Sequence, residues 1–152
     1  MAESVERRET SVANFTGPLY LFLFPVPVVC FIGAMITDIA YAKSEFLMWL
    51  HFSEWLIAAG LAFGALAALV LIIEYIARPV MRDRFGWGHL ALFFAALIVE
   101  LFNALVHSVD GWTAVVPTGM TLSVIGAILA YLAAGALMFM PVAWVEHRRI
   151  RT

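Results

Sequence analysis

The 152-residue sequence is poor in charge and nearly free of cysteine. Charged residues make up 13% of the chain, roughly half the share in a soluble domain, whereas 64% are hydrophobic. The one cysteine, Cys30, excludes an intrachain disulfide and any cysteine-pair motif for zinc or covalently attached haem. A net charge of −2 gives no electrostatic basis for nucleic-acid binding. The composition therefore predicts an integral membrane protein.

Catalytic and export signals are missing as well. The sequence contains no nucleophile motif, phosphate-binding loop or nucleotide fingerprint, and Thr121 and Ser123 have no base near them. This favours a protein that is not an enzyme. The first ten residues mix both signs of charge and lack an apolar core before a cleavage site, which predicts a retained cytoplasmic tail and no signal peptide.

Long apolar runs are what the sequence has instead. Four of them reach the ~20 residues that cross a ~30 Å hydrocarbon core. We predict an all-α fold, an antiparallel four-helix transmembrane bundle, as a single domain over residues 17–147 between polar tails at 1–16 and 148–152. The predicted spans are about 19–41, 51–77, 87–107 and 117–145. Pro25 and Pro27 should bend or unwind the start of the first span, and Pro117 should be the first helical residue of the last.

Positive charge marks one side of this bundle. Of the nine lysines and arginines, all but Lys43 fall in the two tails or in the loop that follows the second span. The positive-inside rule then places both termini in the cytoplasm. Tryptophans near the span ends agree with an aromatic belt at each interface; they are Trp49, Trp55, Trp87, Trp112 and Trp144.

The third span carries a carboxylate, an amide and an imidazole within its apolar run. At 100° per helical residue, Glu100, Asn103 and His107 fall within roughly 60° of one another and line one face. Such groups normally face protein or a water-filled cavity. For Glu100, ~10 Å deeper than His107, three uses compete: a proton relay, a ligand, or a hydrogen-bonded clasp to another helix. The clasp is the simplest, because a protonated carboxyl bonded across helices carries little cost.

Under this topology the polar residues form an outer cluster near the non-cytoplasmic side. Its members are Asp38, His51, Glu54, Glu100, Asn103, His107 and Asp110. His51 and His107 are candidate ligands for haem b or a metal, because helical bundles bind such groups through imidazoles on facing helices. The alternative is that these residues are interfacial, hydrated and bonded to each other.

On the inner side, Glu74 and Arg78 are four residues apart, a favourable order for an ion pair on one helix. His89 begins the third span and could hydrogen-bond Glu74. We interpret the three as a clamp between the second and third spans; a quinone-headgroup site is the functional alternative.

Small residues at four-residue spacing mark close-packing seams for another helix, in this chain or in a partner. The seam residues are Gly60, Gly64, Gly119, Ser123 and Gly126.

Several motifs lie at consistent spacing along the chain. They include Phe24-Pro25-Val26-Pro27, Thr37-Asp38-Ile39-Ala40-Tyr41, Trp87-x-His89, Phe102-Asn103-Ala104, His107-Ser108-x-Asp110-Gly111-Trp112-Thr113 and Val116-Pro117-Thr118-Gly119. In these the chain resembles the DUF2231 family, small bacterial four-span membrane proteins of undefined function, over roughly residues 17–145. Members often begin with a segment holding two histidines beside prolines. Here Gly17-Pro18-Leu19-Tyr20-Leu21 stands in its place and lacks both, so a haem or metal site built on them would be lost.

The resemblance implies a bacterial inner-membrane location. It also implies a place near membrane electron transfer, because family members often accompany redox enzymes such as periplasmic sugar-dehydrogenase-like proteins. We therefore expect an accessory or anchor subunit of a membrane redox complex, in contact with the bilayer and with other subunits or copies of itself. Two alternatives are a cofactor-free structural protein that oligomerises through the seams, and a small proton-conducting or transport unit that uses Glu100.

Overall fold

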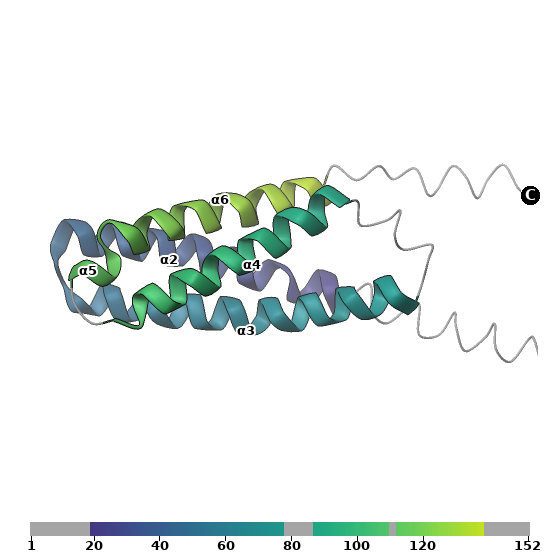
Figure 1. Cartoon of the computed structure of the whole chain (residues 1–152), viewed down its shortest axis with the longest axis horizontal. Coiled ribbons are helices and arrows are strands. Elements are labelled where there is room, and N and C mark those ends of the chain that lie inside the picture. Colours follow the sequence, from purple (N-terminus) through teal and green to yellow (C-terminus); the bar gives the residue numbers. More distant parts are fainter. Residues whose placement is uncertain (1–18, 78–86, 110–111, 139–152) are drawn as a thin grey trace, which may run out of the picture.

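The computed structural model describes residues 19–77, 87–109 and 112–138. Its helices are α2 (Pro25–Ser44), α3 (Leu47–Ala77), α4 (Trp87–His107), α5 (Trp112–Val115) and α6 (Thr118–Met138). The four long helices pack antiparallel, which confirms the predicted all-α bundle (Figure 1). The predicted tails and the part of the last span beyond residue 138 lie outside the described residues.

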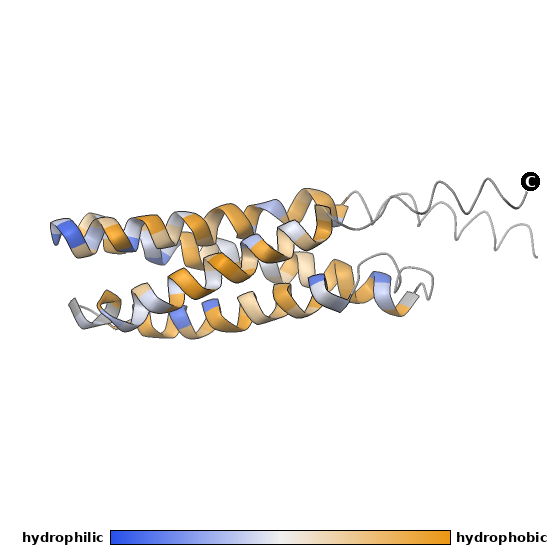
Figure 2. Ribbon diagram, turned by 90° about the horizontal axis from the view of Figure 1, so that it is seen from above, coloured by the Kyte–Doolittle hydropathy of each residue, from blue (hydrophilic) through white to orange (hydrophobic). Residues whose placement is uncertain are grey.

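Four helical segments are long and apolar enough to cross a membrane. They are Leu19–Ser44, Leu47–Ile76, Trp87–His107 and Thr118–Met138. Apolar residues predominate along these helices (Figure 2), and many large apolar side chains are exposed, as a lipid-facing surface requires. The protein is therefore a multi-pass membrane protein.

Some helix boundaries differ from the predicted ones, and they lie next to the turns. The first span continues to Ser44, where Glu45 takes a left-handed conformation (φ 58°) and its N–H bonds the Tyr41 carbonyl at 2.7 Å. The turn is so short that α3 starts at Leu47, about one helical turn before the predicted residue 51. Pro117 precedes α6 instead of opening it, and its carbonyl accepts the Thr121 N–H at 3.1 Å.

The two prolines interrupt the first span near the place expected from the sequence. Residues 19–23 are helical, Phe24 is a turn residue, and α2 begins at Pro25. Because a proline has no N–H to donate, the hydrogen-bond ladder breaks here. The backbone of Phe24 nevertheless stays right-handed (φ −60°, ψ −38°), and its N–H still bonds the Tyr20 carbonyl at 2.8 Å. The chain therefore enters the bundle as one nearly continuous helical path.

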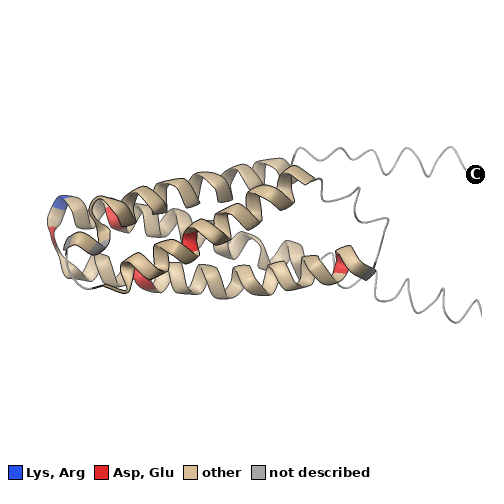
Figure 3. Ribbon diagram, viewed as in Figure 1, with Lys and Arg blue, Asp and Glu red and all other residues tan. Residues whose placement is uncertain are grey.

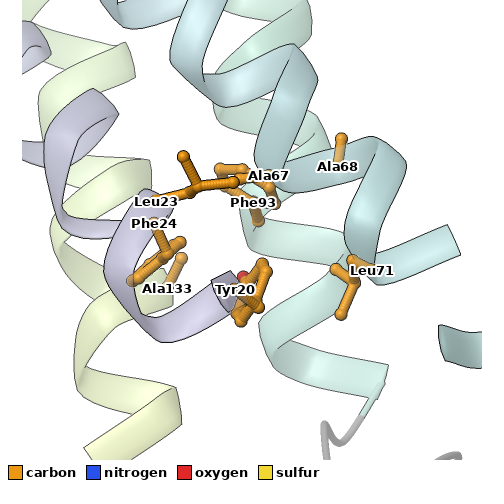
Figure 4. Packing of buried hydrophobic residues seen from close by; sticks show 8 residues of the cluster. All are labelled: Tyr20, Leu23, Phe24, Ala67, Ala68, Leu71, Phe93 and Ala133. Carbon is orange, nitrogen blue, oxygen red and sulfur yellow. The ribbon is translucent and has the colours of Figure 1, made fainter. Parts of the chain in front are cut away.

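Packing brings α2 against α3 and α6, and α4 against α6 and α3. We call the end where residues 19, 77, 87 and 138 lie the terminal end, and the opposite end the loop end (Figure 1). Apolar core fills the terminal end, with Tyr20, Leu23, Phe24, Ala67, Ala68, Leu71, Phe93 and Ala133 in contact (Figure 4). A second layer of Phe31, Ala96 and Ala130 follows toward the middle, and a third of Tyr41, Leu50 and Val115 lies at the loop end.

The small-residue seams are used within this bundle. A Cβ at Gly60 would lie 2.4 Å from the Phe31 ring of α2, and one at Gly64 would lie 2.5 Å from the Leu97 side chain of α4. Gly119 and Ser123 are likewise buried. Since helices in lipid associate mainly through close van der Waals packing, these glycines set how closely α3 approaches its neighbours.

Candidate functional site in the bundle interior

The strongest concentration of polar contacts surrounds Asp38 on α2. Its carboxylate accepts hydrogen bonds from the Ser53 hydroxyl of α3 and the Ser123 hydroxyl of α6. It also lies 3.1 Å from Nε2 of His107 on α4. All four side chains are buried. Asp38 is thus the common acceptor that joins all four long helices.

His107 lies between two acceptors. Its Nε2 faces the Asp38 carboxylate, and its Nδ1 lies 3.1 Å from the Asn103 carbonyl oxygen. A neutral imidazole has one N–H, so only the imidazolium can donate to both oxygens. The His107–Asp38 contact is fully buried, and the same carboxylate accepts the two serine hydroxyls.

Asn103 extends this network one turn deeper. Its side-chain amide donates to Ser123 Oγ at 2.8 Å and to Glu100 Oε2 at 2.9 Å. The Ser123 hydroxyl therefore accepts a hydrogen bond from Asn103 and donates one to Asp38. Two oxygens, Oε1 of Glu100 and Oδ1 of Asn103, have no hydrogen-bond partner among the described residues. We call Asp38, Ser53, Glu100, Asn103, His107 and Ser123 the polar cluster.

Two layers of the hydrophobic core flank the polar cluster along the bundle axis. Phe31, Ala96 and Ala130 lie on its terminal-end side, and Tyr41, Leu50 and Val115 lie on its loop-end side. The next buried polar group on α4 is His89, eleven residues or roughly 16 Å from Glu100. The buried residues of α4 between Glu100 and His89 are Phe93 and Ala96, so this stretch of α4 adds no polar side chain to the bundle interior. Figure 3 shows that Lys, Arg, Asp and Glu are few along the described helices.

The structure does not join every residue that the sequence placed in the outer cluster. Glu54 lies 3.3 Å from His51, and these two form a separate ion pair at the protein surface, where the His51 side chain is 62% exposed. Asp110 lies outside the described residues. The sequence pattern places Ser123 in a packing seam and does not single out Ser53, because a serine in an apolar run gives no sign of its partner.

The two candidate haem ligands therefore occupy different environments. The His107 nitrogens are both committed to protein oxygens, whereas the His51 ring is bonded to Glu54 and faces outward. This arrangement does not fit a haem held between the two imidazoles. No group of three or more His, Cys, Asp or Glu side chains placed to hold a metal ion occurs in the described parts of the chain.

The inner residues are arranged differently from the predicted clamp. The Tyr20 hydroxyl lies 2.5 Å from His89 Nε2, and Nδ1 of the same ring lies 2.9 Å from the Ala133 carbonyl. Both ring nitrogens are thus occupied without Glu74. The Glu74 side chain is buried, and neither of its oxygens has a hydrogen-bond partner within the described ranges. Arg78 falls outside those ranges, so the predicted ion pair concerns a part of the chain that the structure does not describe.

Comparison with protein families matches the chain to the family described as "Predicted membrane protein (DUF2231)", over residues 17–140. The chain belongs to the DUF2231 family. Curated proteins and solved structures give no match. The matched region contains the whole polar cluster of this DUF2231 protein, together with Tyr20 and His89 near the terminal end.

The polar cluster of this DUF2231 protein can chiefly connect helices. Its six side chains come from α2, α3, α4 and α6, and hydrogen bonds run directly between them. In hydrocarbon, polar groups are favourable only when paired, so each bond opposes separation of the helices that it joins. The cluster therefore fixes the rotation and depth of the four helices relative to one another.

Proposed function

We propose that this protein is a non-catalytic accessory or anchor subunit of a bacterial membrane electron-transfer complex. The observation that carries the proposal is the internally bonded polar cluster. Asp38 and His107 are bonded to each other, and Asp38 also accepts serine hydroxyls from two other helices, which suits a rigid body better than a reaction site. The redox setting is supported by the family resemblance, because redox enzymes often accompany DUF2231 members. The inner-membrane location and cytoplasmic termini are part of the same proposal, supported by the distribution of arginines.

Two other functions have weaker support. Oε1 of Glu100, which has no partner among the described residues, favours a proton-conducting role, but the apolar side chains of Phe93 and Ala96 between Glu100 and His89 oppose it. Self-association through the glycine seams is disfavoured, because Gly60 and Gly64 already pack against Phe31 and Leu97. A self-associating structural protein would have to use other surfaces of the bundle.

Purification from native membranes in mild detergent tests the proposal. We expect a second membrane protein to co-purify and to carry the redox chromophore seen in the reduced-minus-oxidised absorbance spectrum. A harsher detergent should leave this chain colourless and the chromophore with its partner. His51→Ala should leave the spectrum of the complex unchanged, since the exposed His51 bonds Glu54 at the protein surface.

Two results would count against the proposal. A split Soret band that stays with the isolated chain, and disappears in His51→Ala or His107→Ala, would mean that the chain itself binds haem. A colourless preparation that contains only this chain would exclude the proposed redox complex and favour a self-associating structural protein.

A further inference from the structure

A groove opens between α3 and α4 at the terminal end of the bundle. Its volume is about 370 Å³, within the ~300–1,000 Å³ typical of ligand pockets. Its walls are Leu71, Ile72 and Tyr75 of α3 together with Leu90, Ala91 and Phe94 of α4, and Trp87 lies at the start of α4 beside them. Figure 1 shows why the space exists: α4 crosses the bundle diagonally, so its beginning diverges from the end of α3.

The groove is apolar and opens sideways from the bundle. Leu71 forms part of its floor and is only 1% exposed, whereas Ile72 is 43% and Trp87 is 73% exposed at its rim. No charged side chain is among the described residues that line it. Because these helices cross the bilayer, the open side of the groove faces hydrocarbon, and an apolar occupant is the only one that it can take without leaving polar groups unpaired.

The length of the groove favours a thin chain over a helix. A partner helix that crosses the bilayer is ~30 Å long, so most of it would lie beyond the groove. Along α4 the groove runs from Trp87 to Phe94, about 10 Å at 1.5 Å per residue. That length fits within one leaflet, which is about half of a ~30 Å hydrocarbon core.

The aromatic residues set the direction of such a chain. The rings of Tyr75 and Trp87 meet edge to face, with centroids 5.9 Å apart, at the end of α3 and the start of α4. Tryptophan and tyrosine at span ends usually lie at the level of the lipid headgroups. The groove thus begins near the headgroups and continues into the leaflet, which is the course of an acyl chain in the bilayer.

We propose that the α3–α4 groove binds one acyl chain of a membrane phospholipid. The bound chain fills the space where α3 and α4 diverge and packs against the aromatic side chains that line the groove. Recognition rests on the hydrocarbon, because Leu71, Ala91 and Phe94 offer only apolar contact. The site is separate from the polar cluster and does not depend on the redox assignment.

The test uses the full-length chain reconstituted in dioleoylphosphatidylcholine vesicles. After extraction in mild detergent, native mass spectrometry counts the phospholipid that stays bound to each chain. We expect one retained lipid in the wild type. In Ala91→Trp the indole fills the groove, and retention should fall about tenfold, because losing even two buried methylenes weakens binding by that order. Ala65→Trp, at an exposed alanine of α3 outside the groove, is the matched control and should retain the lipid.

A second measurement does not require the Ala91 variant to fold. Wild type and Trp87→Phe are compared in vesicles that contain phosphatidylcholine with brominated acyl chains, which quench nearby tryptophans. The Trp87 signal, obtained by difference, should be quenched more than the mole fraction of brominated lipid predicts. Quenching in simple proportion to that fraction, or equal lipid retention in Ala91→Trp and Ala65→Trp, would each overturn the proposal.

Discussion

Replacing Asp38 by alanine is expected to lower the free energy of unfolding by about 3–5 kcal/mol, the usual cost of removing one partner from a buried ion pair. The substitution leaves Nε2 of His107 without Asp38 and removes the carboxylate acceptor of the Ser53 and Ser123 hydroxyls. The side-chain bonds of α4 and α6 to Asp38 are then lost at once, whereas Ser53 keeps the Ala34 carbonyl of α2 at 3.3 Å. The measurement is loss of helicity on titration with sodium dodecyl sulfate in mixed micelles.

The size of the Asp38 effect should depend on His107. In the double variant Asp38→Ala/His107→Ala no unpaired charge remains, so the summed cost of the single variants should exceed that of the double by about 1–3 kcal/mol. The surface pair supplies the control: Glu54→Ala breaks the exposed contact with His51 and should cost about 1 kcal/mol or less. If Asp38→Ala were as mild as Glu54→Ala, the polar cluster would not hold the helices together.

The fold could be predicted because lipid imposes simple constraints on the sequence. A span must be a helix whose length matches the bilayer, and apolar composition reveals this directly. The limits of the helices were harder, because they depend on local turns. Glu45 ends α2 in a left-handed conformation that usually favours glycine, and this kept the first span helical as far as Ser44.

Helical periodicity could place residues on a face but could not identify what they meet. It put Glu100, Asn103 and His107 on one side of α4, and the structure places all three in the interior. Their partners Asp38 and Ser123 lie on other helices, and the choice between them depends on helix rotation and depth, which one sequence does not encode visibly. For the same reason His89 bonds Tyr20 and the Ala133 carbonyl instead of the expected Glu74.

Substitution of the seam glycine Gly126 should have the second large effect on the stability of the bundle. A Cβ built at Gly126 of α6 would lie 2.0 Å from Oε1, 2.6 Å from Cδ and 2.9 Å from Cγ of Glu100. Glu100 has no exposed surface, and Asn103 holds its other oxygen, so the side chain cannot simply swing away. We therefore expect Gly126→Ala to destabilise the bundle by about 1–3 kcal/mol, the range for overpacking a buried site, in the same detergent titration.

This cost should vanish when Glu100 is shortened. In a Glu100→Ala background, the carboxylate that blocks the new methyl group is absent. Gly126→Ala should then be neutral or stabilise α6 by up to about 1 kcal/mol through helix propensity. Gly135 provides the matched control within α6, because a Cβ there meets nothing within 4 Å, and Gly135→Ala should be neutral or slightly stabilising in either background. An equal penalty for Gly126→Ala with and without the Glu100 side chain would place the steric conflict elsewhere. The close approach of α6 to the Glu100 carboxyl would then not determine how α4 packs on α6.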